Sequence, residues 1–489
     1  MPAVQAPKQP YVDARKLGVS PGDASVNVAL NNAISIVSAA GGGVLWMPDG
    51  EYGCTDNIVI RDGVHLYAPG AVVTADASMG AVPMVGFPDS TGGHVDVGIT
   101  GLTLDGNKAN RTSVYPSSHG IALLGAVGNP NQRVRINGCV VKNQPGVSIA
   151  VQNAVYWWVG ECYVQDGARD GINSAGFLQH GFVTRNVVRG CMDDGIAMNA
   201  EFLGSSILRN VVAHNSVFVD RDKESWEVYY GSGITIRGGG HIRVAHNSVD
   251  AAFASGILLE STQYQGFGNV LIQGNAITDA GKRATTESGH GIAVDIGAGT
   301  SGAHTATADR INILDNAVRG SRTHGILVQA ATGCTLTNIR VERNDLDGSG
   351  STSVSRPTTG RGIYLTGNYG CTDLRVRMNA VRNHQSWGID LGDGTRSVTR
   401  LRVEGNDVFN NNQGATSSVG GIRVRVAAGT THLQDNVSKN TSGSSQSHGF
   451  VSVGCSGVGF SYANDFSGNA TANVSIATDT TSWTPGAPS

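Results

Sequence analysis

The sequence predicts an all-β chain: a right-handed single-stranded parallel β-helix with a capping helix at its N-terminal end. Two observations support this fold class. The 489 residues include 68 glycines, 15% charged residues and only 6% aromatic residues, a composition typical of many short strands joined by tight turns. A short phrase with period-two alternation also recurs along the chain, which indicates one supersecondary unit per repeat.

The N-terminal part differs from the repeats that follow it. Residues 26–40 (VNVALNNAISIVSAA) have helical spacing of apolar residues, and we expect this helix to cover the open end of the β-helix. The sequence therefore divides into an N-terminal cap with the first coils (1–80), the β-helix coils (81–455), and a last coil with a tail rich in Ser, Thr and Ala (456–489).

The recurring phrase is built around a glycine and begins at about residue 119. Its glycines lie roughly 23 to 38 residues apart, so short spacings are minimal coils and longer ones carry loops. The residue after the glycine is Ile or Val, and we expect these residues to stack inside the helix. The residue two further on is Leu, Ile, Val or Met in all copies but one, where the polar Ser174 takes this inward position. The copies are HGIALL, PGVSIA, DGINSA, DGIAMN, SGITIR, SGILLE, HGIAVD, HGILVQ, RGIYLT, WGIDLG and GGIRVR.

A second phrase, N-x-V or similar, follows each glycine and predicts another strand with a turn asparagine. Asparagine tolerates left-handed turns and bonds to neighbouring backbone, so these residues fit an internal ladder. Between residues 210 and 215 the register stays open, because RNVV and HNSV both fit. The ladder positions are Asn137, Asn186, Asn247, Asn275, Asn316, Asn344, Asn379 and Asn406.

Charge and cysteine usage narrow the classes of partner. The formal net charge is −3 and there is no Lys/Arg run, so we expect no nucleic acid partner. No stretch approaches the roughly 20 apolar residues of a membrane span, and no signal peptide is visible. The seven cysteines are scattered without metal-binding spacing, which predicts small buried side chains and no zinc site.

Stacking of the coils predicts two outward columns of side chains, with neighbours about 4.8 Å apart. The residue before each glycine forms one column: His119, Pro145, Asp170, Asp194, Ser232, Ser255, His290, His324, Arg361 and Trp387. The fourth residue after each glycine forms the other: Leu124, Ala150, Ala175, Asn199, Arg237, Glu260, Asp295, Gln329 and Thr366. Both columns turn polar between about residues 170 and 329.

Crowded carboxylates are the main catalytic candidates. Glycoside hydrolysis needs one protonated and one ionised carboxyl group, and like charges held close together separate their pKa values in that way. Asp170, Asp193 and Asp194 form one candidate group, and Glu260 with Asp295 forms a second. Asp-Gly is also an ordinary turn dipeptide, so Asp170 and Asp194 have a purely structural alternative. The sequence does not choose between retention and inversion.

Other polar and aromatic residues are candidates for binding a substrate. His290 and His324 suit hydrogen bonds to sugar hydroxyls or acid–base work near neutral pH, with plain exposed residues as the alternative. Arg237 suits an acidic sugar or the base of a lyase. We add Asn173 and Asn199 as polar neighbours, and Trp226, Tyr229 and Tyr230 in the insertion FVDRDKESWEVYYG as stacking residues. Asp193, Asp194 and Glu201 are the candidate ligands of a calcium ion, and we expect no other cofactor.

At these motifs the chain resembles the pectin-lyase-like superfamily of lyases, hydrolases, epimerases and phage tailspikes. The motifs RDGIN and MDDGIAMN resemble those of polygalacturonase-type hydrolases and contain all three of their carboxylates. Three other motif positions differ: Ser232 stands at the histidine of GHG, Asn199 stands at the lysine of the second motif, and RIK is not present. Alginate epimerases share LTLDGN, but their DPHE tetrad falls on Asn173, Ser174, Ala175 and Gly176, which opposes epimerase or alginate lyase activity.

The resemblance and the carboxylates together predict a polysaccharide-degrading enzyme, a glycoside hydrolase bound along the β-helix groove. A polysaccharide lyase is the nearest alternative, and a non-catalytic glycan-binding phage tail or adhesin protein is the alternative from another class. The resemblance also implies an extracellular or virion-tail location. Trimers are common in this group, and no residue of this sequence shows one.

Overall fold

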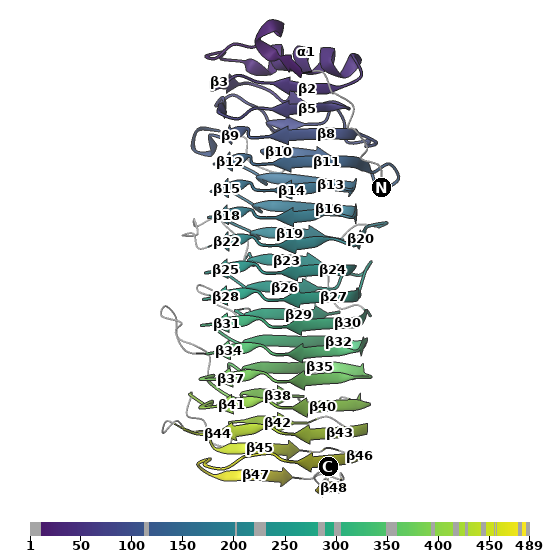
Figure 1. Ribbon diagram of the computed structural model, residues 1–489, viewed down its shortest axis with the longest axis vertical. Helices are drawn as coiled ribbons and strands as arrows, with labels where there is room; N and C mark the ends of the chain where they lie inside the picture. The colour runs from purple at the N-terminus through teal and green to yellow at the C-terminus, as the bar shows by residue number, and fades with distance from the viewer. Residues whose placement is uncertain are drawn as a thin grey trace, which may run out of the picture. The chain divides into compact units, whose positions relative to one another are not determined.

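The computed structural model describes residues 11–111, 117–200, 203–219, 231–281, 289–297, 305–348, 359–392, 397–413, 420–425, 429–441, 446–453, 455, 457–477 and 482–485. They form two compact units. Unit 1 comprises the chain up to Met198 together with Gly204–Ser206, and unit 2 comprises the other described residues. Each unit is a stack of parallel β-helix coils (Figure 1), which confirms the predicted fold class.

The described residues up to 199 form two short 3-10 helices, one α-helix and nineteen strands. The helices are η1 (Ala14–Leu17), α1 (Val26–Ala39) and η2 (Lys108–Asn110). The strands are β1 (Tyr11–Asp13), β2 (Gly43–Trp46), β3 (Gly50–Cys54), β4 (Ile58–Val59), β5 (Val64–Tyr67), β6 (Ala71–Ala75), β7 (Val85–Gly86), β8 (Val95–Thr100), β9 (Thr103–Asp105), β10 (Ile121–Leu124), β11 (Asn131–Asn137), β12 (Val140–Lys142), β13 (Ile149–Val155), β14 (Trp158–Gly160), β15 (Tyr163–Gln165), β16 (Ile172–Gln179), β17 (Phe182–Thr184), β18 (Val187–Arg189) and β19 (Ile196–Asn199).

The elements from residue 206 on are all strands. They are β20 (Ser206–Leu208), β21 (Val211–Ala213), β22 (Ser216–Phe218), β23 (Ile234–Arg237), β24 (Gly239–Ala245), β25 (Ser248–Asp250), β26 (Ile257–Glu260), β27 (Phe267–Gln273), β28 (Ala276–Thr278), β29 (Ile292–Ile296), β30 (Thr307–Leu314), β31 (Ala317–Arg319), β32 (Ile326–Thr337), β33 (Ile339–Glu342), β34 (Asp345–Asp347), β35 (Ile363–Cys371), β36 (Leu374–Arg377), β37 (Ala380–Arg382), β38 (Ile389–Leu391), β39 (Ser397–Val398), β40 (Arg400–Glu404), β41 (Asp407–Phe409), β42 (Ile422–Val424), β43 (Gly429–Gln434), β44 (Val437–Lys439), β45 (His448–Val453), β46 (Gly457–Tyr462), β47 (Ala472–Ala477) and β48 (Ser482–Pro485).

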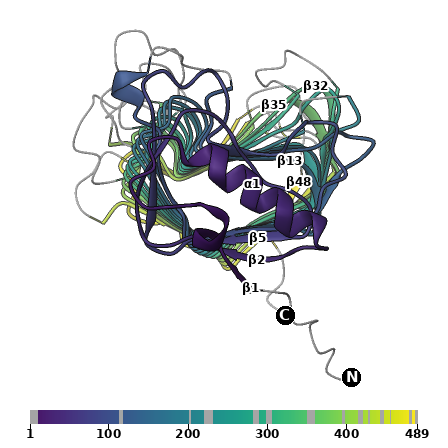
Figure 2. The same cartoon turned by 90° about the horizontal axis from the view of Figure 1, so that it is seen from above.

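Helix α1 is the predicted cap of unit 1. Its buried side chains include Leu30, Ile34 and Val37, which share one face at the 3-to-4-residue spacing of an α-helix. The helix packs on β2 to β5, and Figure 2 shows it crossing the first coils. Asn31 Oδ1 accepts a hydrogen bond from the backbone N–H of Val59 at 2.7 Å, so the cap also satisfies a strand donor.

The coils repeat three parallel strands in register. In unit 1, β13, β14 and β15 pair with β16, β17 and β18, and in unit 2, β29, β30 and β31 pair with β32, β33 and β34. The predicted isoleucine stack is confirmed within each unit. Ile121 and Ile172 are fully buried in unit 1, as are Ile257, Ile292 and Ile326 in unit 2. Ser174 points inward as predicted, and its hydroxyl donates to the carbonyl oxygen of Ala197 at 3.1 Å.

Close approach of neighbouring coils accounts for the recurring glycine. A Cβ atom added at Gly256 would lie 2.4 Å from Cγ2 of Ile277 and 2.7 Å from the carbonyl oxygen of Gly291. No side chain fits in that space, because the turn passes directly over the core. Glycine therefore precedes the inward strand in most coils.

One copy of the glycine phrase was assigned in the wrong register. Ile149, and not Val147, pairs with Ile121 and Ile172, so the column position after His119 belongs to Val147 rather than Pro145. Ser148 stands where the other coils have the glycine, and it is fully buried. Because this coil has a small serine in place of the glycine, a search for the glycine pattern assigned the wrong residues to it.

The asparagine ladder is confirmed in unit 2, with longer bounds than the sequence predicted. Nδ2 of Asn247 donates to Oδ1 of Asn275 at 2.9 Å, and Nδ2 of Asn275 donates to Oδ1 of Asn316 at 2.9 Å. The same pattern continues through Asn344, Asn379 and Asn406, and it also includes Asn215, Asn436 and Asn464. Asn215 therefore settles the open register between residues 210 and 215.

In unit 1 one ladder prediction holds and one is wrong. Asn186 Oδ1 accepts from the backbone N–H of Cys162 at 3.0 Å, as a ladder residue should. Asn137 instead directs Nδ2 to Glu161 at 3.3 Å near the surface, and Cys139 takes the inner position. All seven cysteines are free and buried, as predicted. Within the described ranges, no helix is long and apolar enough to cross a membrane.

Candidate functional site

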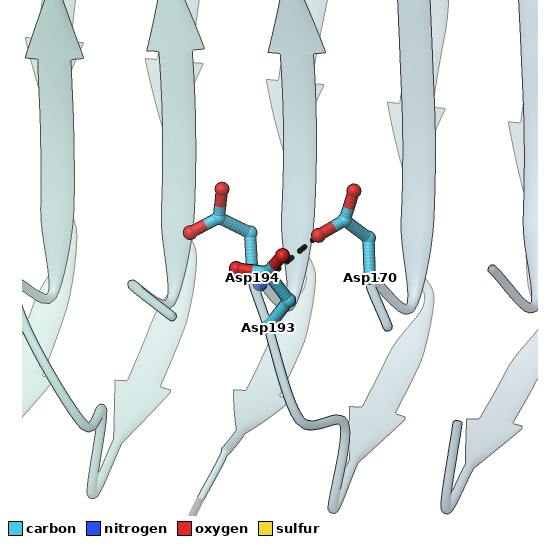
Figure 3. A group of neighbouring side chains, drawn as sticks. All are labelled: Asp170, Asp193 and Asp194. Carbon is cyan, nitrogen blue, oxygen red and sulfur yellow. Dashed lines mark hydrogen bonds between the residues drawn. The ribbon is translucent and has the colours of Figure 1, made fainter. Parts of the chain in front are cut away.

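Asp170, Asp193 and Asp194 come together in unit 1, where they precede strands β16 and β19. The backbone N–H of Gly171 donates to the carbonyl oxygen of Asp194 at 3.0 Å, and this ladder bond places Asp170 beside Asp194 on consecutive coils. One carboxylate oxygen from each of the three residues lies within 4.8 Å of the others (Figure 3). The sequence predicted this cluster from the two Asp-Gly phrases.

Asp170 has the environment of a carboxyl group that keeps its proton. Its side chain is 6% exposed, and it accepts hydrogen bonds from Nδ2 of Asn173 and, at 3.1 Å, from the backbone N–H of Asp194. Burial raises the pKa of Asp170 well above its ordinary value, and the charges of Asp193 and Asp194 raise it further. Asn173 and Arg169 oppose this rise only in part.

Asp193 has a different environment from Asp170. Its side chain is 18% exposed, and the Nη2 atom of Arg169 lies 3.6 Å from its Oδ2 atom. A nearby positive charge favours the ionised carboxylate. Asp194 is almost fully buried, so the cluster presents three carboxyl groups in three different surroundings.

The arrangement allows acid–base chemistry with two carboxyl groups. A protonated Asp170 next to an ionised Asp193 is the pairing that glycoside hydrolysis uses. Among the described residues, this is also the one group of three or more His, Cys, Asp and Glu side chains close enough to share a cation. Calcium usually takes six to eight oxygen ligands, and three carboxylates supply only some of them. The further calcium ligand expected from the sequence, Glu201, lies outside the described residues.

His119 lies on the same outward column, two coils before Asp170. Its Nδ1 atom accepts a hydrogen bond from the backbone N–H of Val147 at 3.2 Å. Burial, with a smaller effect from the charge of Arg169, lowers the pKa of His119 to about 4. The ring is therefore neutral at neutral pH and borders the cluster without adding charge. The sequence placed His119 in the column but gave it no role.

The second candidate pair lies in unit 2. Glu260 and Asp295 pair in register on strands β26 and β29, as the predicted column requires. Glu260 is buried and forms an ion pair with Arg237, whose Nε lies 2.9 Å from Oε2. Nη1 of Arg237 also donates to Oδ1 of Asn199 at 3.1 Å, and Gln329 donates to Asp295 at 2.7 Å. These are the contacts of a paired polar network, whereas the unit 1 cluster brings three carboxyl groups together.

His290 and His324 stack on each other in unit 2, with ring centroids 5.1 Å apart. Both residues are only 8% exposed, so the alternative prediction that they are ordinary exposed residues is wrong. Burial lowers the pKa of His290 to about 4, and burial with the nearby charges of His290, Arg361 and His384 holds the pKa of His324 well below its ordinary value. Imidazole rings with pKa values this far below neutral are weak bases, which opposes the acid–base role. Hydrogen bonding to sugar hydroxyls stays a prediction.

The other predicted binding residues are divided between these surroundings. Asn173 contacts Asp170, and Asn199 contacts Arg237. Trp226, Tyr229 and Tyr230 lie outside the described residues. Sequence reasoning missed a buried ion cluster in unit 2, where Asp390 pairs with Arg361 at 2.6 Å and with Arg423. Arg361 and Asp390 lie on outward positions of consecutive coils, but nothing in the glycine phrase marks the pairing.

Comparison with known proteins agrees with the fold. The family model described as "Right handed beta helix region" matches residues 90–277. No curated protein matches the sequence significantly. The chain therefore has a right-handed parallel β-helix fold.

Solved structures with this architecture are remote in sequence. The tailspike protein of E. coli bacteriophage HK620 in complex with a pentasaccharide is 12% identical with a TM-score of 0.54, over 97% of this chain and 80% of the tailspike. A double mutant of that tailspike is 12% identical with a TM-score of 0.58, over 96% of this chain and 78% of the tailspike. The Azotobacter vinelandii mannuronan C-5 epimerase AlgE4 A-module is 14% identical with a TM-score of 0.40, over 98% of both chains. At these identities the two tailspike structures establish a shared fold alone.

Proposed function

We propose that this protein is a polysaccharide-degrading enzyme, a glycoside hydrolase that uses the carboxylate cluster of unit 1. The observation that supports this most is the position of three carboxyl groups within 4.8 Å, one of which has a strongly raised pKa. A shared architecture hosts many activities, so the proposal depends on the site and not on the fold.

In this mechanism Asp170 is the general acid. It gives its proton to the glycosidic oxygen of the leaving sugar while the bond to the anomeric carbon breaks. Asp193 is ionised beside Arg169 and either takes a proton from the attacking water or attacks the anomeric carbon itself. Asp194 is the third group of the cluster, and its negative charge helps to keep Asp170 protonated. The anomer of the first product, followed by proton NMR, distinguishes the two routes.

The nearest chemical alternative, a lyase, finds less support in the surroundings of Arg237. Elimination needs a base placed at an acidic sugar, and the sequence offered Arg237 for that role. Its guanidinium is bonded to both Glu260 and Asn199, and arginine stays protonated in proteins. The HK620 tailspike, whose solved structure contains a pentasaccharide, has the same fold, which supports a carbohydrate ligand for this chain. The proposal places the protein outside the cell or on a virion tail.

The test is a reducing-end assay on a panel of neutral and acidic polysaccharides, with absorbance of unsaturated uronates recorded in parallel. We expect wild type to release reducing ends without this absorbance, and Asp170→Asn and Asp193→Asn to lower the rate by roughly 10²- to 10⁴-fold. Asp407→Asn, an exposed position in unit 2, is the matched control and should keep full activity.

Other outcomes point elsewhere. Rising absorbance would identify a lyase, and a rate abolished by a chelator and restored by calcium would identify a metal-dependent reaction. Silence of wild type on the whole panel would favour a non-catalytic glycan-binding protein. Fully active Asp170→Asn and Asp193→Asn variants would move the search to Glu260 and Asp295.

A further inference from the structure

A group of aromatic side chains lies on the outer surface of unit 1, away from the carboxylate cluster. Tyr156 follows strand β13, Trp158 begins β14, His180 follows β16 and Phe182 begins β17. Tyr156 is 59% exposed and Phe182 is 41% exposed, values that are high for such large side chains. We call these four residues the aromatic surface.

The run YWW at residues 156–158 produces this surface. Alternation directs Trp157 inward, where it is 1% exposed, and directs Tyr156 and Trp158 outward. The indole of Trp158 occupies the space over Gly160, since a Cβ atom added there would lie 2.1 Å from Nε1. A glycine at this position lets a large ring settle against the strand.

The rings line up between consecutive coils because the strands are in register. Trp158 pairs with Phe182, and their ring centroids are 5.5 Å apart. The backbone N–H of Tyr156 donates to the carbonyl oxygen of Gln179, so Tyr156 lies beside His180 with ring centroids 4.9 Å apart. The result is a two-by-two arrangement of rings.

Two guanidinium groups lie near the Trp158 ring. Arg135 and Arg185 place their guanidinium carbons 5.6 Å and 5.9 Å from the centre of the Trp158 ring. Arg185 is neutralised by Glu161 at 2.8 Å, whereas Arg135 is exposed and has no carboxylate partner among the described residues. The border of the aromatic surface is therefore polar with a positive charge.

We propose that the aromatic surface is a second glycan-binding site, specific for a polysaccharide that carries acidic sugars. The rings offer apolar faces for the C–H faces of sugar rings, and the arginines offer donors to a carboxylate. A protein partner would need about 800 Å² on each side, more than four side chains provide. The choice of a glycan rests on the proposed function, although binding here does not require catalysis.

The second site is distinct from the carboxylate cluster. Asp170 lies just before β16 and His180 just after it, at opposite ends of an eight-residue strand. Gly176, with a φ of +82°, bends that strand between the two sites. A polymer held at the aromatic surface leaves the carboxylates accessible, so the site would act as an anchor for a long chain.

The test is electrophoresis through native gels containing alginate, hyaluronan or neutral dextran. We expect at least one acidic polysaccharide to retard wild type more than dextran does. Tyr156→Ala with Phe182→Ala should weaken that binding at least tenfold. Both positions are exposed, so the double variant should melt at the temperature of wild type. Tyr264→Ala, an exposed tyrosine in unit 2, is the matched control and should bind as wild type does.

Three results would overturn the inference. The first is a folded double variant that binds as wild type does, and the second is wild type that no acidic polysaccharide retards more than dextran. The third is a difference in sedimentation between wild type and the double variant, which would show that the surface is a contact between copies of the chain. Asp193→Asn separates the two proposals. If this variant binds the acidic polysaccharide as wild type does and also keeps its cleavage activity, the proposed hydrolase mechanism is wrong but the aromatic binding site is still supported.

Discussion

At the scale of single residues, the carboxylate cluster depends on how differently three neighbouring aspartates are surrounded. Sequence spacing was enough to predict that Asp170, Asp193 and Asp194 would be crowded. It could not predict that Asp170 would be buried or that Arg169 would lie near Asp193, because both depend on how the turns fold over each other. The assignment of acid and base therefore needed the structure.

The raised pKa of Asp170 predicts a specific dependence of stability on pH. Below pH 3.8, the ordinary aspartate value, Asp170 is protonated in both the folded and the unfolded state. As the pH rises, the unfolded chain loses this proton first, so the free energy of unfolding falls by up to about 1.4 kcal/mol per pH unit until the folded group also ionises. Asp170→Asn lacks this loss, so its stability relative to wild type should increase with pH.

Urea unfolding of both proteins at a series of pH values from 3.5 to 7.5 measures this difference. The amide of Asn173 and the backbone N–H of Asp194 both donate to Asp170, so the variant also carries a cost that does not depend on pH. The slope against pH is therefore the informative quantity. Parallel curves for wild type and Asp170→Asn would show that the carboxyl is not perturbed, and Asp407→Asn provides the baseline.

At the scale of elements, the asparagine ladder of unit 2 holds the coils together through side chains. Nδ2 of Asn316 donates to the carbonyl oxygen of Ile272 and to Oδ1 of Asn344, and its Oδ1 accepts from Asn275. Asn316→Ala would leave several of these buried groups unsatisfied and should lower the free energy of unfolding by roughly 2–5 kcal/mol. Denaturation by urea measures it. Asn312→Ala, at an outward position of the preceding strand β30, should change stability by less than about 0.5 kcal/mol.

A loss from Asn316→Ala no larger than that of Asn312→Ala would mean that the ladder bonds add no net stability. The ladder also shows where sequence patterns stop being reliable. N-x-V located the unit 2 asparagines because a buried turn there needs both a donor and an acceptor. In unit 1, Cys139 fills the same position with a small apolar side chain, and the nearby Asn137 was chosen in its place.

At the scale of the whole molecule, the recurring glycine was enough to predict the fold class. Each coil must bring its turn close to the next coil, and a position such as Gly256 has no room for a side chain. That requirement recurs in most coils, so it is visible in the sequence. The paired network of Arg237 and Glu260 and the aromatic surface of unit 1 follow no such rule and appear only when the coils are stacked.

The position of the carboxylates predicts the mode of cleavage. They project from the outer side of the coils that contain β16 and β19. The preceding coils continue that side with Ala122, Val147 and Ala150, which pack together and are buried. We expect a polymer to reach carboxylates on the side of a coil without threading its end, so cleavage should be internal. Viscosity should then fall early, while few reducing ends have formed. The Asp170→Asn variant should leave the viscosity unchanged. If wild type instead releases short sugars from the first minutes with little loss of viscosity, cleavage is at chain ends, and the polymer must be blocked on one side of the carboxylates.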